Sequence, residues 1–296
     1  MATSRSAAFR PAALIPVYNH PATVEAVVSA LIRQKIHVIV VDDGSDTPTR
    51  DACDRCAKVG ATVIHRKVNG GKGAAMISGF RAAAKAGFTH VVQIDADGQH
   101  DISAVQHFLT LSKKYPDALI CGYPQYDKTV PPARFWGRKL TNFWVAVNSL
   151  SMSFADAMCG LRVYPVSAAV QITSNARIGL RMEFDPEILV RLIWMGVRVK
   201  NLPVAVTYPA DGVSHFRGLH DNMRISLMHA KLFILMLTRF PFILCSRMTG
   251  WQGGCPSAPA ALRTQPAPSA ASQPLRPTAQ PAAPAADTAD KTDSPR

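Results

Sequence analysis

Short apolar runs alternate with helical patterns through the first half of the chain. Runs rich in Val and Ile predict five β-strands, and the segments between them have the three- and four-residue apolar spacing of amphipathic helices. The predicted strands are residues 12–19, 37–43, 62–66, 90–95 and 117–123, and the predicted helices are residues 21–34, 48–59, 72–86 and 101–114. Repeated β-α units with almost continuously apolar strands predict an α/β fold, in which helices cover both faces of a mostly parallel sheet.

The second half of the chain is less regular. Its pattern predicts an amphipathic helix over 131–150, a loop and strand over 153–164 and a helix over 184–196. Residues 197–208 read as a pair of strands broken at Pro203, because proline cannot donate a hydrogen bond to a neighbouring strand.

Residues 221–248 predict one long apolar helix that basic residues interrupt. Its longest uncharged stretch runs from Leu232 to Thr238, which is much shorter than the roughly 20 apolar residues of a membrane-spanning helix. Basic residues among apolar ones are typical of a helix that lies in a membrane interface. A core helix that closes the domain has the same pattern, so both interpretations stay open.

Composition divides the chain into four predicted parts. Residues 1–10 form a flexible N-terminus, residues 11–220 one α/β domain, and residues 221–248 the amphipathic, possible membrane-interfacial helix. Residues 249–296 are rich in Pro and Ala and have one aromatic residue, Trp251. Such a segment buries too little apolar surface to offset its conformational entropy, so we expect a disordered tail.

The chain is strongly basic, with 33 Lys and Arg against 20 Asp and Glu and a formal net charge of +13. This charge favours phosphorylated ligands or an anionic membrane surface. No basic run interleaves with aromatic residues and no nucleic-acid motif is present, so nucleic acid is not an expected partner. Residues 1–13 lack the sustained apolar run of a secretory signal, and we expect a cytoplasmic location.

Two carboxylates follow the predicted strand in the segment HVVQIDADGQH, at Asp95 and Asp97. Alternate residues of an extended segment point the same way, so both carboxylates can face one point beyond the strand. Mg²⁺ or Mn²⁺ suits such a pair and keeps coordination positions open for phosphate oxygens. A polar turn is the alternative interpretation.

Other polar residues fall at the same predicted edge of the sheet. Ligands of parallel α/β sheets bind beyond the carboxyl ends of the strands, where Asn19, Asp42 and Asp43 also lie. Asp42 and Asp43 can accept hydrogen bonds from a nucleobase or a ribose. The glycine-rich segment NGGKGAAM precedes a helix, and its backbone N–H groups and Lys72 suit a diphosphate. This shared edge favours the metal site over the plain turn.

Six segments in order, IPVYN, VVDDGSD, NGGKGAA, DADGQH, CGLRVY and EFDPEILVRLIWMG, resemble glycosyltransferase family 2. The resemblance covers about residues 12–220. Within this family, the segments resemble most the branch that includes dolichyl-phosphate mannose synthase and bacterial polyprenyl-phosphate glycosyltransferases. It implies a Rossmann-like GT-A fold, a UDP- or GDP-linked sugar donor, a divalent metal and inversion at the anomeric carbon.

The resemblance also implies roles for individual residues that bind the donor and the metal. The implied donor contacts are Pro16, Tyr18 and Asn19 near the nucleoside, Asp42 and Asp43 at the base and ribose, Lys72 and Gly73 near the ribose and diphosphate, and Asp95 with Gln99 beside the diphosphate. Asp95 and Asp97 would hold Mg²⁺ or Mn²⁺.

Three acids are candidates for the base that accepts the acceptor's proton, and the resemblance leaves the choice open. Asp156 matches the acid before CGLRVY in the polyprenyl-phosphate branch, and Glu183 and Asp185 match the acidic cluster of other branches. We favour Asp156. Arg162 is expected to pair with a phosphate. His215 and Arg217 lie in a predicted basic loop that would close over the diphosphate or meet an anionic acceptor.

These observations predict a metal-dependent inverting glycosyltransferase that acts on a lipid-linked or amphipathic acceptor. Peripheral association with the inner face of the cytoplasmic membrane is expected. Two other functions stay open: a non-catalytic scaffold that binds a nucleotide-sugar, and a sugar nucleotidyltransferase. A sugar nucleotidyltransferase would need a glycine-rich basic loop directly after the first strand, where this chain has IPVYNHPAT.

Overall fold

A computed structural model describes residues 8–125, 132–205 and 218–249. The predicted tail beyond Thr249 and most of the predicted flexible N-terminus lie outside the described residues. His215 and Arg217, both predicted to contact the donor or acceptor, also lie outside them.

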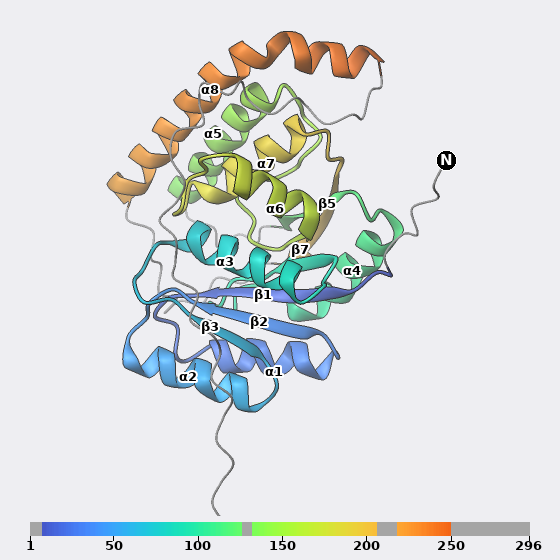
Figure 1. The fold of residues 1–296 in the computed structure, drawn as a ribbon. Helices are drawn as coiled ribbons and strands as arrows, with labels where there is room; N and C mark the ends of the chain where they lie inside the picture. Colours follow the sequence, from blue (N-terminus) through green and yellow to red (C-terminus); the bar gives the residue numbers. More distant parts are fainter. Residues whose placement is uncertain (1–7, 126–131, 206–217, 250–296) are drawn as a thin grey trace, which may run out of the picture. The chain divides into compact units, whose positions relative to one another are not determined.

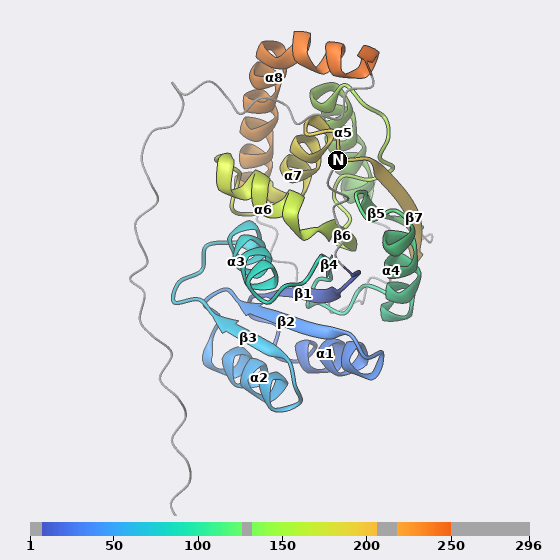
Figure 2. The same cartoon turned by 45° about the vertical axis from the view of Figure 1, so that its right-hand side comes forward.

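Seven strands form one sheet in the order β3-β2-β1-β4-β6-β5-β7 (Figures 1 and 2). The strands are β1 (Pro11–Val17), β2 (His37–Asp42), β3 (Thr62–His65), β4 (His90–Gln93), β5 (Leu119–Gln125), β6 (Arg162–Pro165) and β7 (Val199–Ala205). All neighbours are parallel except β6, which runs antiparallel to both β4 and β5. The predicted α/β fold with a mostly parallel sheet is confirmed.

Helices cover both faces of this sheet (Figure 1). They are α1 (Val24–Arg33), α2 (Thr47–Lys58), α3 (Lys72–Lys85), α4 (Val105–Lys114), α5 (Pro132–Ser149), α6 (Val166–Asn175), α7 (Phe184–Trp194) and α8 (Gly218–Thr249), with a short 3₁₀ turn at Ile102–Ala104. One apolar core lies beneath α1, α2 and α4, and a second joins α3 with α5, α6, α7 and α8.

The strands reach both cores because their side chains alternate between the two faces. In β1, Leu14 belongs to the core beneath α3, and Ile15 belongs to the core beneath α1. Val40 and Val41 of β2 divide in the same way. A strand that is buried on both faces therefore needs an almost unbroken apolar sequence.

Two elements differ from the sequence prediction. Helix α6 was not predicted, because it follows β6 directly and its apolar residues continue those of the strand. The predicted break at Pro203 is wrong: β7 is one strand, in which Pro203 lies opposite Tyr123 of β5. In the described part of the chain, β7 is the last strand of the sheet and has a neighbouring strand on one edge only, and such a strand tolerates proline.

Helix α8 packs one face against the domain and exposes the other. Ile225, Met228 and Leu232 are buried in the core shared with α5 and α7, whereas Leu227 and Ile234 are exposed. Among the described residues, no helix combines the length and apolar character needed to cross a membrane.

Candidate functional site

The carboxyl ends of β1, β2 and β4 meet at one edge of the sheet. Val17 lies opposite Asp42 in the pairing of β1 with β2, and Leu14 lies opposite Gln93 in the pairing of β1 with β4. The residues after these strands therefore start from neighbouring positions. Parallel packing thus brings the predicted acids of separate segments to one rim.

Asp42 is a buried carboxylate that holds the turn after β2. It accepts hydrogen bonds from the backbone N–H of Ser45 at 2.9 Å and from Nδ1 of His65 at 2.8 Å. Burial opposes ionisation, but the bonds from His65 and Ser45 outweigh it and lower the pKa of Asp42. Nε2 of His65 also contacts Asp54 at 2.9 Å. Sequence reasoning missed His65, which no recognised segment contains.

Asp43 joins the same turn to the start of α3. Its two oxygens accept the backbone N–H groups of Gly70 at 3.1 Å and Gly71 at 2.6 Å, and Arg66 lies 3.1 Å from it. Burial raises the pKa of Asp43, and the two backbone bonds partly offset that rise. The amides of Gly70 and Gly71 are thus used within the protein, and Lys72 supplies the positive charge at this helix start.

The approach of these two loops requires a glycine at position 44. Gly44 has a φ of 69°, and a Cβ atom there would lie 2.7 Å from the backbone nitrogen of Asn69. An L-residue is strained at this φ and also lacks the space. The glycine of DDGSD therefore lets the turn after β2 touch the loop before α3.

Lys72 lies between two acids from distant segments. Its ammonium is 2.7 Å from Oδ1 of Asp95 and 2.8 Å from Oδ2 of Asp185. Burial alone would lower the pKa of Lys72, but the charges of Asp185 and Asp95 outweigh it and raise that pKa. Burial likewise works against ionisation of Asp95, and the charge of Lys72 reverses this and lowers its pKa. His100 Nε2 lies 3.8 Å from Oδ2 of Asp95.

Asp97 is the second acid of the D-A-D segment. Its Oδ1 accepts the backbone N–H of Gln99 at 3.0 Å. Burial, and then the negative charge of Asp95, raise the pKa of Asp97. A divalent cation between Asp95 and Asp97 would relieve this repulsion, so the pair fits Mg²⁺ or Mn²⁺. Within the described residues, no group of three or more His, Cys, Asp and Glu is arranged to hold a metal.

The segment CGLRVY packs directly on Asp95 through Gly160. A Cβ atom at Gly160 would overlap Oδ2 of Asp95 and lie 2.7 Å from its Cγ. Gly73 shows a similar restriction at the start of α3, where a Cβ atom would lie 2.8 Å from Phe184. Gly160 therefore lets the segment CGLRVY approach the carboxylate of Asp95, and Gly73 lets the start of α7 approach α3.

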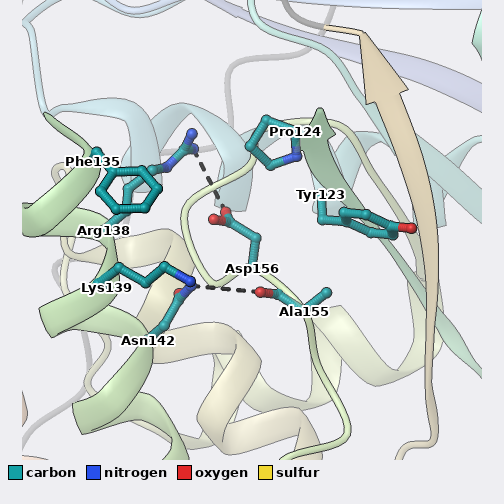
Figure 3. Close-up of a pocket in the computed structure, with 8 residues that line it drawn as sticks. All are labelled: Tyr123, Pro124, Phe135, Arg138, Lys139, Asn142, Ala155 and Asp156. Carbon is teal, nitrogen blue, oxygen red and sulfur yellow. Dashed lines mark hydrogen bonds and ion pairs between the residues drawn. The ribbon is translucent and has the colours of Figure 1, made fainter. Parts of the chain in front are cut away.

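Asp156 borders a separate cavity of about 250 Å³ (Figure 3). Its Oδ1 accepts the backbone N–H of Met158 at 2.8 Å and lies 3.5 Å from Nη2 of Arg138. The cavity is lined by Tyr123, Pro124, Phe135, Arg138, Lys139, Asn142, Ala155 and Asp156. The sequence predicted a role for Asp156 but not for the lining residues of α5, which are Phe135, Arg138, Lys139 and Asn142. Their three- and four-residue spacing indicated only an amphipathic helix.

Arg162 connects the segments that carry the candidate bases. Its fully buried guanidinium donates to the backbone carbonyls of Asp185 at 2.8 Å and Ala157 at 2.6 Å. Its predicted pairing with a phosphate stays a prediction. In these contacts Arg162 holds the loop of Asp156 against the start of α7.

The three candidate bases have different surroundings. Asp185 contacts Lys72, and Asp156 faces the cavity. Glu183 is buried, and its Oε1 lies 3.4 Å from the backbone nitrogen of Arg181. Its Oε2 has no hydrogen-bond partner among the described residues. Of the three acids, Asp156 is the one that lines the cavity of Figure 3.

The residues predicted near the nucleoside lie beside the turn after β2. Asn19 has a φ of 53°; its backbone N–H donates to Ser45 Oγ at 3.2 Å, and its side-chain oxygen accepts from the Asp46 N–H at 3.0 Å. Pro16 lies opposite Val41 in the sheet. Tyr18 lies between Val17 and Asn19. These three residues and Gln99 keep their donor contacts as predictions.

Comparison with known proteins identifies the family. A family model described as glycosyl transferase family 2 matches residues 12–167, and the chain belongs to this family. It is a glycosyltransferase by family. Its fold resembles that of S. aureus TarS 1–349, crystallised in complex with UDP, with a TM-score of 0.50 and 12% identity over 75% of this chain and 65% of that one.

Two curated relatives refine this assignment. The polyprenol monophosphomannose synthase of Mycolicibacterium smegmatis is 27% identical over 223 residues, which cover 73% of this chain and 83% of the relative. The undecaprenyl-phosphate mannosyltransferase of Micrococcus luteus is 26% identical over 220 residues, covering 69% and 86%. The predicted resemblance to the polyprenyl-phosphate branch is confirmed.

Proposed function

We propose that this glycosyltransferase moves a sugar from a UDP- or GDP-linked donor to the phosphate of a lipid-linked acceptor, with inversion. The observation that carries the proposal is the cavity beside Asp156, which is lined by Arg138 and Lys139. Two cations next to one acid suit an anionic acceptor group. The names of the two curated relatives, which are enzymes of polyprenol and undecaprenyl phosphate, support this acceptor class.

The donor would lie along the rim formed by the strand ends. Asp42 and Asp43 would face the nucleoside, and Lys72 would bring a positive charge to the diphosphate. Mg²⁺ or Mn²⁺, held by Asp95 and Asp97, would neutralise charge on the diphosphate as it leaves. The support for this placement is the carboxylate pair, in which burial and Asp95 raise the pKa of Asp97.

The proposed transfer joins these two sites. An oxygen of the acceptor phosphate forms a bond to the anomeric carbon, while the bond between that carbon and the diphosphate breaks. The electron pair of the broken bond leaves with the nucleoside diphosphate. Asp156 would accept the remaining proton of a singly ionised phosphate, while Arg138 and Lys139 hold that phosphate. Glu183 and Asp185 remain the other candidate bases.

A transfer assay tests the proposal. The purified full chain would be incubated with radiolabelled UDP- and GDP-sugars, Mg²⁺ or Mn²⁺, and either a short prenyl phosphate or the matched prenyl alcohol. We expect transfer to the phosphate only. Arg138→Gln should raise the KM for the acceptor and leave donor affinity unchanged, whereas Arg50→Gln on the exposed side of α2 serves as the matched control. Equal transfer to the alcohol, or an unaltered KM in Arg138→Gln, would contradict the proposed acceptor site.

The same enzyme would work at the inner face of the cytoplasmic membrane, where a lipid acceptor is available. The basic charge of the chain and the exposed apolar side of α8 support peripheral association. Cell fractionation before and after a salt wash would test it: recovery of the full chain only from the soluble fraction, before any wash, would exclude this location.

A further inference from the structure

Helix α5 exposes large apolar side chains on the face opposite its packed side. Trp136, Leu140 and Phe143 follow the spacing of one helical face and are 69%, 61% and 59% exposed. Val145 and Asn148, on the other side of the helix, are buried. A group of large apolar side chains exposed to water indicates a surface that binds another molecule or a membrane.

Helix α8 adds a second exposed apolar face. Met223, Leu227, Ile234 and Leu237 lie on the side that faces away from its buried residues, and each is more than half exposed. The buried side of α8 is also apolar, so this helix has two opposite apolar sides, with the exposed residues Arg224 and Lys231 between them. The apolar side that lies in water indicates a surface that contacts a partner.

The two exposed faces form one continuous surface. The ring of Phe143 lies 5.6 Å from that of Trp144, and Trp144 lies 6.4 Å from Phe233 of α8. Asn148 of α5 also bonds His229 of α8. Both views show α8 beside α5, on the side of the domain away from α1 and α2 (Figures 1 and 2).

Helix α8 is fixed to the domain by an ionic cluster around the buried carboxylate of Glu187. Lys231 donates to Oε1 of Glu187 at 3.1 Å and to the carbonyl of Arg177 at 2.7 Å, and Arg191 binds the same oxygen of Glu187 at 2.6 Å. Glu187 is almost completely buried. The apolar face of α8 is therefore presented by a helix already packed in place.

The charge of this surface selects among possible occupants. Helix α5 contains no Asp or Glu, and the single acid of α8, Asp221, is buried. Lys139 and Arg224 are exposed on the two helices. A second copy of the chain would bring like charges together, whereas an anionic bilayer offers both apolar depth and negative charge.

We propose that the exposed faces of α5 and α8 dock on an anionic phospholipid bilayer. The surface meets the cavity beside Asp156 at Lys139, which is exposed on α5 and also lines that cavity. Docking therefore places the cavity next to the lipid headgroups. Docking deepens the peripheral association of the proposed function by naming the surface and the lipid that it contacts. The supply of a membrane-borne phosphate to the cavity rests on the proposed function, whereas binding of the surface to lipid can be measured without any transfer.

Vesicle flotation tests the docking. The full chain is mixed with vesicles of phosphatidylglycerol or of phosphatidylcholine. We expect binding to phosphatidylglycerol that added salt weakens. Trp136→Ser with Phe143→Ser, or Leu227→Ser with Ile234→Ser, should each reduce binding by roughly tenfold or more. Val59→Ser removes an exposed apolar residue beyond the end of α2 and should bind like the unchanged chain.

Three outcomes would overturn the docking proposal. The first is that the chain does not bind phosphatidylglycerol vesicles, and the second is that both double variants bind like the unchanged chain. The third is that the chain is a dimer without lipid, as measured by light scattering, and that these substitutions dissociate the dimer. Circular dichroism and thermal unfolding establish that each variant is folded. If one double variant unfolds, the other decides, because the two lie on different helices.

Activity separates this proposal from the proposed function. On a water-soluble short prenyl phosphate, the docking variants should keep the activity of the unchanged chain. On the long-chain acceptor embedded in vesicles, they should lose most of it. Vesicle binding without transfer to any prenyl phosphate would leave docking standing and refute the function, whereas transfer without vesicle binding would do the reverse.

Discussion

Replacing Lys72 by Met should expose how the rim acids are held together. Methionine keeps an unbranched apolar stem of similar size and removes the ammonium. In the unchanged protein this ammonium contacts Asp95 at 2.7 Å and Asp185 at 2.8 Å, and the side chains of Lys72 and Asp185 are only 16% and 8% exposed. The variant leaves two acids close together without their shared cation.

The expected cost follows from this burial. Removing one partner of a fully buried ion pair costs about 3–5 kcal/mol. Asp95 is 26% exposed, so water recovers part of the loss, and we expect Lys72→Met to lower the free energy of unfolding by about 2–3 kcal/mol. A domain of ordinary stability, about 5–15 kcal/mol, remains folded after that loss.

Urea unfolding of four proteins measures the effect: the unchanged chain, Lys72→Met, Asp185→Asn and the double variant. Contacting residues should show non-additive changes, with a coupling free energy of about 1–3 kcal/mol. Lys85→Met, at the exposed end of the same helix, is the control and should change stability by less than about 0.5 kcal/mol. Additive changes at Lys72 and Asp185 would refute the role assigned to this contact.

The same contact predicts an acid dependence of known sign. Lys72 lowers the pKa of Asp95 in the folded protein, so its stabilisation is present above the ordinary pKa of an aspartate, about 3.8. It is lost as pH falls below that value, because Asp95 takes up its proton more readily in the unfolded chain. The stability gap between the unchanged chain and Lys72→Met should therefore narrow in acid. A gap that is constant down to the acid transition would contradict this assignment.

Three further predictions concern the metal pair, the proposed base and a buried histidine. Gly160→Ala should displace Asp95 and weaken Mn²⁺ affinity at least about tenfold by calorimetry, while Gly137→Ala, whose Cβ has no neighbour within 4 Å, should leave it unchanged; equal affinities would contradict the packing argument. Asp156→Asn should lower kcat by about 10²-fold or more with little change in donor Kd, and an unchanged kcat would transfer the base role to Glu183 or Asp185. Burial lowers the pKa of His229 to about 4, so the unfolded chain gains its proton first as pH falls from 6.5. The free energy of unfolding should therefore fall by up to about 3 kcal/mol between pH 6.5 and about 4. Urea unfolding of His229→Gln should show a weaker dependence on pH, because the variant lacks this imidazole. A pH dependence as steep as that of the unchanged chain would refute the assignment.

Local sequence patterns predicted most elements of the fold. A strand buried on both faces must be continuously apolar, and an amphipathic helix must repeat its apolar residues every three or four positions, so β1 to β5 and most helices could be located. Helix α6 escaped because it continues an apolar strand without a polar boundary. The unbroken β7 escaped because the edge position that tolerates Pro203 is a property of the assembled sheet.

The candidate site divides in the same way. The carboxylates after β2 and β4 were predictable because each follows its own strand, and parallel strands end at one edge. The contact of Lys72 with Asp185 and the cavity between Arg138 and Asp156 were not, since each joins segments with no shared local pattern. His65, which holds Asp42, was missed for the same reason.

The sequence by itself therefore determined the order of most strands and helices along the chain, the family resemblance and the acids at the strand ends. Those features follow from burial periodicity and chain connection, which are local. Only the tertiary structure decided that Asp185 shares Lys72 with Asp95, that Asp156 faces a basic cavity and that α5 and α8 expose one apolar surface. These depend on how side chains from distant segments pack, because packing selects which charges meet and which apolar faces remain in water.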